Sequence, residues 1–195
     1  MKEPGLIEIA DAQITYRNFA GREMEYNQEG DRNFSILLPD DLADALAADG
    51  WNVKQMKLHD GQITPQKHLP VSIKYRNRDG SKARTPPTMI YITSRGKTAL
   101  GEDEVEMFDY TDIARVDVSV RPYVWDMHGK QGVKAYVKEL YITAEESQLS
   151  LRYADVPQID LNGNRLAIES GEGAGDDVWD VDPIEEDDPK ELTRG

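Results

Sequence analysis

The sequence predicts a mainly β domain with one short helix and an acidic C-terminal tail. Several segments are rich in β-branched and aromatic residues and are bounded by Gly, Pro, Asn or Asp, a pattern typical of strands joined by turns. From about residue 156 apolar residues become sparse, while glycines and acids accumulate. We therefore expect a folded domain over 1–156, a linker over 157–170 and a disordered acidic tail over 171–195, where burial cannot offset ordering entropy.

The individual elements follow from local patterns along the chain. Strands are expected at 6–19, 32–38, 51–58, 69–76, 88–94, 115–127 and 132–143, and a helix at 39–50. Asp40 and Asp41 suit the positive N-terminal end of that helix. Leu42 and Leu46 share one face, and Gly50 is placed to end it.

The net charge of −14 over 195 residues conceals a basic centre. Residues 51–100 hold 10 basic and 2 acidic side chains, a net charge of +8, whereas 171–195 hold 2 basic and 10 acidic, a net charge of −8. A basic block inside an anionic chain suggests a surface for a polyanion. The alternative is that these cations pair with acids of the flanking segments.

No recognisable pattern for catalysis or cofactor binding is present. The chain has no cysteine, which excludes disulfides and thiolate zinc sites and is typical of a reducing compartment. His59, His68 and His128 lack metal-ligand spacing and are expected at the surface. The SRGKT segment at 94–98 lacks the first glycine of a phosphate-binding loop. With no apolar run that predicts a signal peptide or a membrane span, we expect a cytoplasmic protein that is not an enzyme and needs no metal or cofactor.

Strand alternation predicts an unusual solvent-facing surface. In 115–127 the odd positions Arg121, Tyr123 and Trp125 lie opposite the valines, and in 132–143 Lys134 and Tyr136 lie opposite apolar residues. Rings between cations fit single-stranded nucleic acid, since cations bind phosphates and rings stack on bases. The alternative is a second core, with the rings under a helix or a dimer partner. The core-facing valines would be Val116, Val118, Val120 and Val124.

The candidate binding residues combine this surface with the basic centre. Stacking is expected from Tyr91, Tyr123, Trp125 and Tyr136. Phosphate contacts are expected from Lys74, Arg76, Arg78, Lys82, Arg84, Arg95, Lys97, Arg121, Lys134 and Lys138. Three of these cations lie in the loop 77–87. We interpret this loop as an exposed arm that closes over a bound strand of nucleic acid, or else as an ordinary polar hairpin.

The tripeptide Arg-Asn-Phe occurs twice in the N-terminal region. The first copy makes Arg17 and Phe19 candidates for the rim of a binding groove. In the second copy Phe34 shares a strand face with Ile36 and Leu38, so we expect Phe34 in the core.

The acidic tail has two possible roles beside a basic groove. It can compete with nucleic acid for the groove, and it can dock onto a basic pocket of another protein. Trp179 and Ile184, bracketed by acids, are the expected anchors of such a contact. The alternative is a tail that only confers solubility.

Three long segments resemble a known family. TYRNFAGREMEYNQEGDRNFSILLPDDLADALAADGWNVKQMK (15–57), MIYITSRGKTAL (89–100) and VRPYVWDMHGKQGVKAYVKELYIT (120–143) are similar to bacteriophage single-stranded DNA-binding proteins of the oligonucleotide/oligosaccharide-binding (OB) type. The resemblance covers about 6–156. It implies an OB-like barrel of five or more strands that binds single-stranded DNA without strong sequence preference. The role it implies is to protect and organise that DNA during phage replication, recombination or repair in the host cytoplasm.

Other readings of the sequence remain open at this point. The acidic composition also suits a DNA mimic that inhibits a host enzyme, and exposed aromatics also suit a virion structural or assembly domain. The tail ends in KELTRG with Trp179 set inside, whereas many single-strand binders end in an aromatic residue that docks onto partner proteins.

Overall fold

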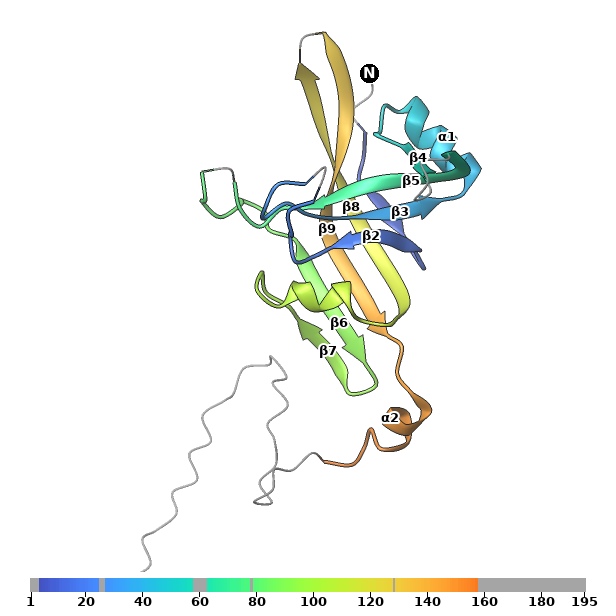
Figure 1. Cartoon of the computed structure of the whole chain (residues 1–195), viewed down its shortest axis with the longest axis vertical. Coiled ribbons are helices and arrows are strands. Elements are labelled where there is room, and N and C mark those ends of the chain that lie inside the picture. Colours follow the sequence, from blue (N-terminus) through green and yellow to red (C-terminus); the bar gives the residue numbers. More distant parts are fainter. Residues whose placement is uncertain (1–3, 25–26, 58–62, 78, 128, 158–195) are drawn as a thin grey trace, which may run out of the picture.

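The computed structural model describes residues 4–24, 27–57, 63–77, 79–127 and 129–157. These residues form one nine-stranded sheet with short helices at its margins (Figure 1). In chain order the elements are β1 (Ile7–Ile9), β2 (Ile14–Asn18), β3 (Arg32–Leu38), α1 (Asp40–Ala48), β4 (Lys54–Lys57), β5 (Ile63–Ile73), β6 (Thr88–Thr93), β7 (Gly96–Ala99), the 3-10 helix η1 (Val105–Asp109), β8 (Ile113–Met127), β9 (Lys130–Ala144) and α2 (Gln148–Arg152).

The sheet is mixed and branched. Its main order is β1-β8-β9-β5-β3-β2, with β4 paired to β5, and β6 paired to both β9 and β7. The pairs β5–β9 and β6–β9 are parallel, and the others are antiparallel. Figure 1 shows the hairpin of β8 and β9 projecting beyond the body at one end, with β6 and β7 at the opposite end.

The core lies on one face of the central strands. Phe34 on β3 pairs with Val71 on β5, which pairs with Ala135 on β9, and all three are buried. Ile36 and Leu38 are buried as well, so the predicted core face of β3 is confirmed. Because side chains alternate across a strand, residues one step along from this row lie on the opposite, solvent-facing side.

The first predicted strand is interrupted by a bend, where Asp11 has a φ of 52°. Beside it, the backbone contacts two different strands. The Ala12 amide donates to the Val116 carbonyl on β8 at 2.7 Å, and the Leu37 amide of β3 donates to the Gln13 carbonyl at 2.8 Å. The bend therefore joins β1 beside β8 to β2 beside β3.

Two predictions about burial are wrong. Val124 is 50% exposed, because its part of β8 belongs to the projecting hairpin rather than to the body. His68 is buried, with the Tyr16 ring centroid 5.5 Å from its own. Burial, with a smaller contribution from the charge of Lys54, lowers the pKa of His68.

The predicted helix is confirmed as α1, with Ala43 and Leu46 buried, while Gly50 follows it at a φ of 85°. β4 is shorter than predicted, and Trp51 before it is part of the core. β5 begins at Ile63, earlier than predicted. β7, η1 and α2 are too short to give a periodic signal, and the sequence did not predict them. None of the helices in the described ranges is long and apolar enough to cross a membrane.

Candidate nucleic-acid interface

A polar row crosses four strands on the solvent-facing side of the sheet. Asn33 on β3 pairs with Ser72 on β5, Ser72 pairs with Tyr136 on β9, and Tyr136 pairs with Arg121 on β8. Directly opposed residues of neighbouring strands share a face. Tyr136 and Arg121, predicted to face solvent on separate strands, are therefore neighbours here.

The same face continues along the projecting hairpin. Tyr123 pairs with Lys134, and Trp125 pairs with Gly132. The rings of Tyr123 and Tyr136 meet edge to face with centroids 5.9 Å apart, and the Lys134 ammonium lies 5.2 Å from the centre of the Tyr136 ring. Tyr123 is 57% exposed. Three predicted stacking residues and two predicted cations thus form one continuous surface.

Gly132 makes room for the indole of Trp125. A Cβ atom at Gly132 would lie 2.7 Å from Cζ2 of Trp125, closer than carbon atoms can pack. The backbone of β9 thus supports the half-buried indole on the face that carries Tyr123. Glycine in a strand often marks such a close approach.

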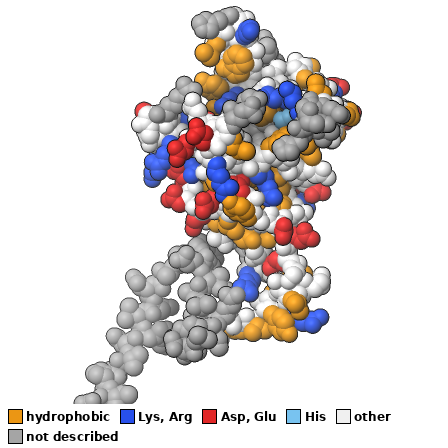
Figure 2. All heavy atoms as spheres, viewed as in Figure 1, with side chains coloured by type: hydrophobic (Ala, Val, Ile, Leu, Met, Phe, Trp, Pro, Cys, Tyr) orange, Lys and Arg blue, Asp and Glu red, His pale blue; other side chains and the backbone are white. Residues whose placement is uncertain are grey.

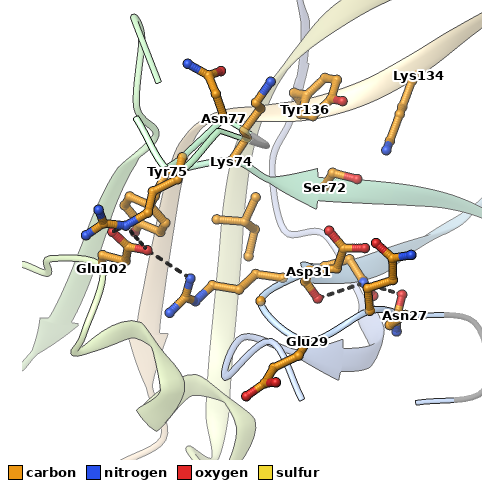
Figure 3. Close-up of a pocket in the computed structure, with 17 residues that line it drawn as sticks. Asn27, Glu29, Asp31, Ser72, Lys74, Tyr75, Asn77, Glu102, Lys134 and Tyr136 are labelled. Atoms are coloured by element: carbon orange, nitrogen blue, oxygen red, sulfur yellow. Dashed lines mark hydrogen bonds and ion pairs between the residues drawn. The ribbon is translucent and has the colours of Figure 1, made fainter. Parts of the chain in front are cut away.

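A cleft of about 590 Å³ lies where this face meets the end of β5. Its walls are the segment 27–31, the first residues of β3 and the last residues of β5. Figure 3 shows Tyr136 between Lys74 and Lys134 on one side of the cleft. Within the described ranges, neither lysine takes part in an ion pair. Both ammonium groups are therefore available to an anion.

The other cations of the cleft are held by one carboxylate. Glu102 accepts from Arg76 at 2.9 Å and pairs with Arg32 at 3.2 Å (Figure 3). Arg32 also lies 5.8 Å from the centre of the Tyr75 ring. Burial raises the pKa of Tyr75 to about 12, and its buried hydroxyl has no hydrogen-bond partner among the described residues.

Sequence reasoning missed the role of Glu102. No local pattern indicates that its carboxylate reaches an arginine 26 residues away. Arg32 was likewise assigned no role, although it begins β3 at the mouth of the cleft. The alternative interpretation of the basic centre, in which its cations pair with acids of the flanking segments, is confirmed for Arg76 and Glu102.

The loop 77–87 is a hydrogen-bonded hairpin in its first half. The Asn77 amide donates to the Ser81 carbonyl at 2.8 Å, and the Ala83 amide donates to the Tyr75 carbonyl at 2.7 Å. Arg121 of β8 donates to the carbonyl of Thr85 at 2.9 Å and also to its hydroxyl. These bonds fix the loop beside the hairpin base, with exposed Lys82 and Arg84 on it.

Four predicted residues are not part of this surface. Tyr91 on β6 is half-buried, with its ring centroid 5.9 Å from that of Phe108. Arg95 lies in the turn between β6 and β7, and Lys97 lies on β7, at the opposite end of the molecule from the β8–β9 hairpin (Figure 1). Lys138 pairs with Glu139 at 3.2 Å where the register of β8 and β9 shifts.

The predicted rim residues belong to the other side of β2. Phe19 is fully buried and packs against the rings of Phe34 and Phe108, each 5.4 Å away, so its assignment to a rim is wrong. Arg17 donates to the carbonyls of Phe108 and Thr111 at 3.0 and 2.8 Å, which anchors β2 to η1. Arg78, Trp179 and Ile184, as well as the linker and tail, lie outside the described residues.

Charge is mixed around the interface. The cleft is lined by four cations and three carboxylates, a net charge of +1. Figure 2 shows basic and acidic side chains interspersed over the visible face of the body, with hydrophobic side chains on the projecting hairpin. This surface therefore offers a ligand exposed rings and two lysines that form no ion pair with the described residues, rather than a strongly basic field.

The chain is similar to several proteins of bacteriophages. A family model described as "Putative phage ssDNA-binding domain" matches residues 2–191. No curated protein matches the sequence. The structure of the single-stranded DNA-binding protein from bacteriophage Enc34 in complex with ssDNA is 12% identical with a TM-score of 0.46, covering 73% of this chain and 88% of that one. For gp2.5, a single-stranded DNA-binding protein encoded by bacteriophage T7, the values are 12%, 0.34, 83% and 98%.

Proposed function

Since this chain belongs to the family of phage ssDNA-binding domains, whose function is to bind single-stranded DNA, we propose where that DNA binds. The bound DNA lies along the solvent-facing side of β3, β5, β8 and β9. The family resemblance found in the sequence is confirmed by this membership. The observation that carries the proposal is the row Asn33–Ser72–Tyr136–Arg121, flanked by Tyr123 and by two lysines without ion pairs.

The chemistry of the surface supports binding without strong sequence preference. Tyr123, Trp125 and Tyr136 offer ring faces and edges to bases, and stacking contributes about 1–3 kcal/mol per base whatever the base. Lys74 and Lys134 would bind phosphates. Such contacts release counterions, so affinity falls as salt rises. The predicted contacts Lys82 and Arg84 would join from the loop beside the hairpin base.

We also propose that the sheet closes into an OB-type barrel through the bend between β1 and β2. The bonds from Ala12 to Val116 and from Leu37 to Gln13 support this, because the one bent segment pairs with β8 on one side and β3 on the other. A closed barrel leaves one sheet face and its adjoining loops as a groove for oligonucleotides.

The biological role that follows is to protect and organise single-stranded DNA during phage replication, recombination or repair in the host cytoplasm. The acidic segment 171–195 would supply a docking site for replication or recombination proteins, with Trp179 and Ile184 as anchors. These two apolar residues among acids are what supports that role of the tail.

A titration with poly-dT at two salt concentrations tests the proposal, with tryptophan fluorescence as the readout. We expect DNA to quench the emission, and the quenching to weaken at the higher salt. In a Trp179→Phe background, the change Trp125→Phe should remove most of the quenching, because the remaining Trp51 is buried in the core. Absence of quenching at low salt, from protein that circular dichroism shows to be folded, would refute binding at this face.

A further inference from the structure

Tyr16 on β2 is an exposed aromatic residue in a strained backbone conformation. Its φ is 50°, in a region that is unfavourable for a residue with a Cβ atom and that tends to be retained at functional sites. The pairing of β2 with β3 shifts register between Thr15 and Asn18, which is a β-bulge around Tyr16. Bulges often re-aim a side chain.

The ring of Tyr16 is held in place and still reaches solvent. Its hydroxyl donates to the carbonyl of Lys57 at 3.1 Å, and its plane is tilted by 58° against the ring of His68. The residue nevertheless remains 48% exposed. A ring fixed at its tip and along one side loses little conformational freedom when a base stacks on the remaining surface.

Tyr16 contacts the same face of the sheet as the proposed interface. The pairing of β3 with β5 is continuous from Arg32–Ile73 to Leu38–Lys67, so His68 lies on the same face as Ser72. They are four positions apart along the strand, about 13 Å at roughly 3.3 Å per residue. Pro70 lies between them on that face, opposite Ser35.

A lysine lies beside Tyr16 on this face, as Lys134 lies beside Tyr136. Lys54 pairs with His68 across β4 and β5, so it shares the face that carries His68. Lys54 is exposed, and it forms no ion pair within the described ranges. One end of this face therefore repeats the combination of ring and unpaired lysine found at the other end.

Building on the proposed function, we infer that Tyr16 is a second base-stacking position and that Lys54 binds the phosphate beside it. The DNA strand then runs from the hairpin, over Tyr136 and Ser72, along the outer face of β5 to β4. Short oligonucleotides would occupy only one end, and longer ones would span both.

The direct test is photocrosslinking with oligo-dT that carries 5-iodouracil, followed by mass-spectrometric identification of the crosslinked residues. We expect crosslinks at Tyr16 as well as at Tyr123, Trp125 or Tyr136. Crosslinks at the hairpin alone would overturn the second position and leave the proposed function intact. Crosslinks at neither end would overturn both.

Affinity for long oligo-dT gives the second readout. Tyr16→Gly removes the ring, while glycine adopts the positive φ without strain, so the fold should be kept. We expect its affinity to fall by at least about fivefold, with Tyr16→Phe close to wild type. Tyr153→Ala, which removes an exposed ring after α2, is the matched control. A folded Tyr16→Gly protein with unchanged affinity would show that Tyr16 serves only the structure.

Discussion

The Nε atom of Arg76 lies 2.9 Å from one carboxylate oxygen of Glu102 and 3.1 Å from the other. Arg32 approaches the same carboxylate from β3. Glu102 thus occupies the place between two guanidinium groups that a phosphate would take. If DNA enters the cleft as proposed, it must either displace this carboxylate or pass beside it, so we expect Glu102 to lower the affinity.

We therefore expect Glu102→Gln to bind oligo-dT more tightly. Removing one like charge near a phosphate relieves about 1 kcal/mol of repulsion in water, so affinity should rise roughly threefold to tenfold at low salt. The gain should shrink as salt screens the charges. Fluorescence titrations at two salt concentrations measure this difference.

Glu106→Gln is the control for that experiment. Glu106 lies in η1, is exposed and takes part in no ion pair among the described residues. The two changes alter net charge equally, so a purely global effect of charge would raise affinity to the same extent in both. That result would show that Glu102 does not repel a nearby phosphate of the DNA.

The sequence predicted the strands and the parity of the interface because alternation is a local property. Tyr123 and Lys134 lie on the predicted faces of their strands, and the hairpin register places them side by side. Val124 was misassigned because alternation indicates which face a residue occupies, but not where along the strand the core ends. The point at which the core ends depends on which other strands pack against β8.

Long-range contacts are what the sequence could not supply. Arg17 lies on β2 and Phe19 directly follows it, and both are fixed by η1 or its flanks, about 90 residues later. The 3-10 helix itself gave no periodic signal. An exposed aromatic residue beside a cation has the same local sequence pattern as a buried aromatic residue beside a structural arginine. The sequence therefore assigned Phe19 to the rim wrongly.

The contact between Gly132 and Trp125 predicts that a substitution at Gly132 weakens DNA binding without lowering stability. In Gly132→Ala the new Cβ atom would meet the indole at 2.7 Å, and the ring must shift. No unusual φ is required at this position, so the backbone should tolerate alanine. We expect altered tryptophan emission and weaker quenching by oligo-dT, with a melting temperature close to wild type.

Gly5→Ala provides a comparison for that substitution, because a Cβ atom at Gly5 would meet nothing within 4 Å. Its emission and quenching should match wild type. If Gly132→Ala also leaves both unchanged, then the position of the Trp125 ring is not set by Gly132.

Lys74 and Lys134 should account for part of the salt dependence of binding. Each phosphate contact on a single strand contributes about 0.7 to the slope of log affinity against log salt. The double change Lys74→Ala with Lys134→Ala should therefore lower the magnitude of that slope by about 1.4. Titrations at several salt concentrations give the slope directly.

The matched variant for this pair is Lys67→Ala with Arg152→Ala. Lys67 lies 2.6 Å from Asp44, and Arg152 lies on α2, so both are outside the proposed path while the loss of charge is identical. An equal reduction of the slope in both double variants would mean that net charge, and not contact, determines the salt dependence.

The raised pKa of Tyr75 predicts how the free energy of unfolding changes at alkaline pH. Burial raises its pKa in the folded protein from about 10 to about 12, so the unfolded chain loses this proton first. The contribution of Tyr75 to stability is therefore fully present below pH 10 and is lost as pH rises towards 12. Tyr75→Phe keeps the ring and removes a hydroxyl that has no hydrogen-bond partner. We expect the variant to unfold in urea like wild type at pH 8 and to be relatively more stable at pH 11. If the difference in unfolding free energy between the two proteins stays constant from pH 8 to 11, the hydroxyl of Tyr75 is solvated rather than buried.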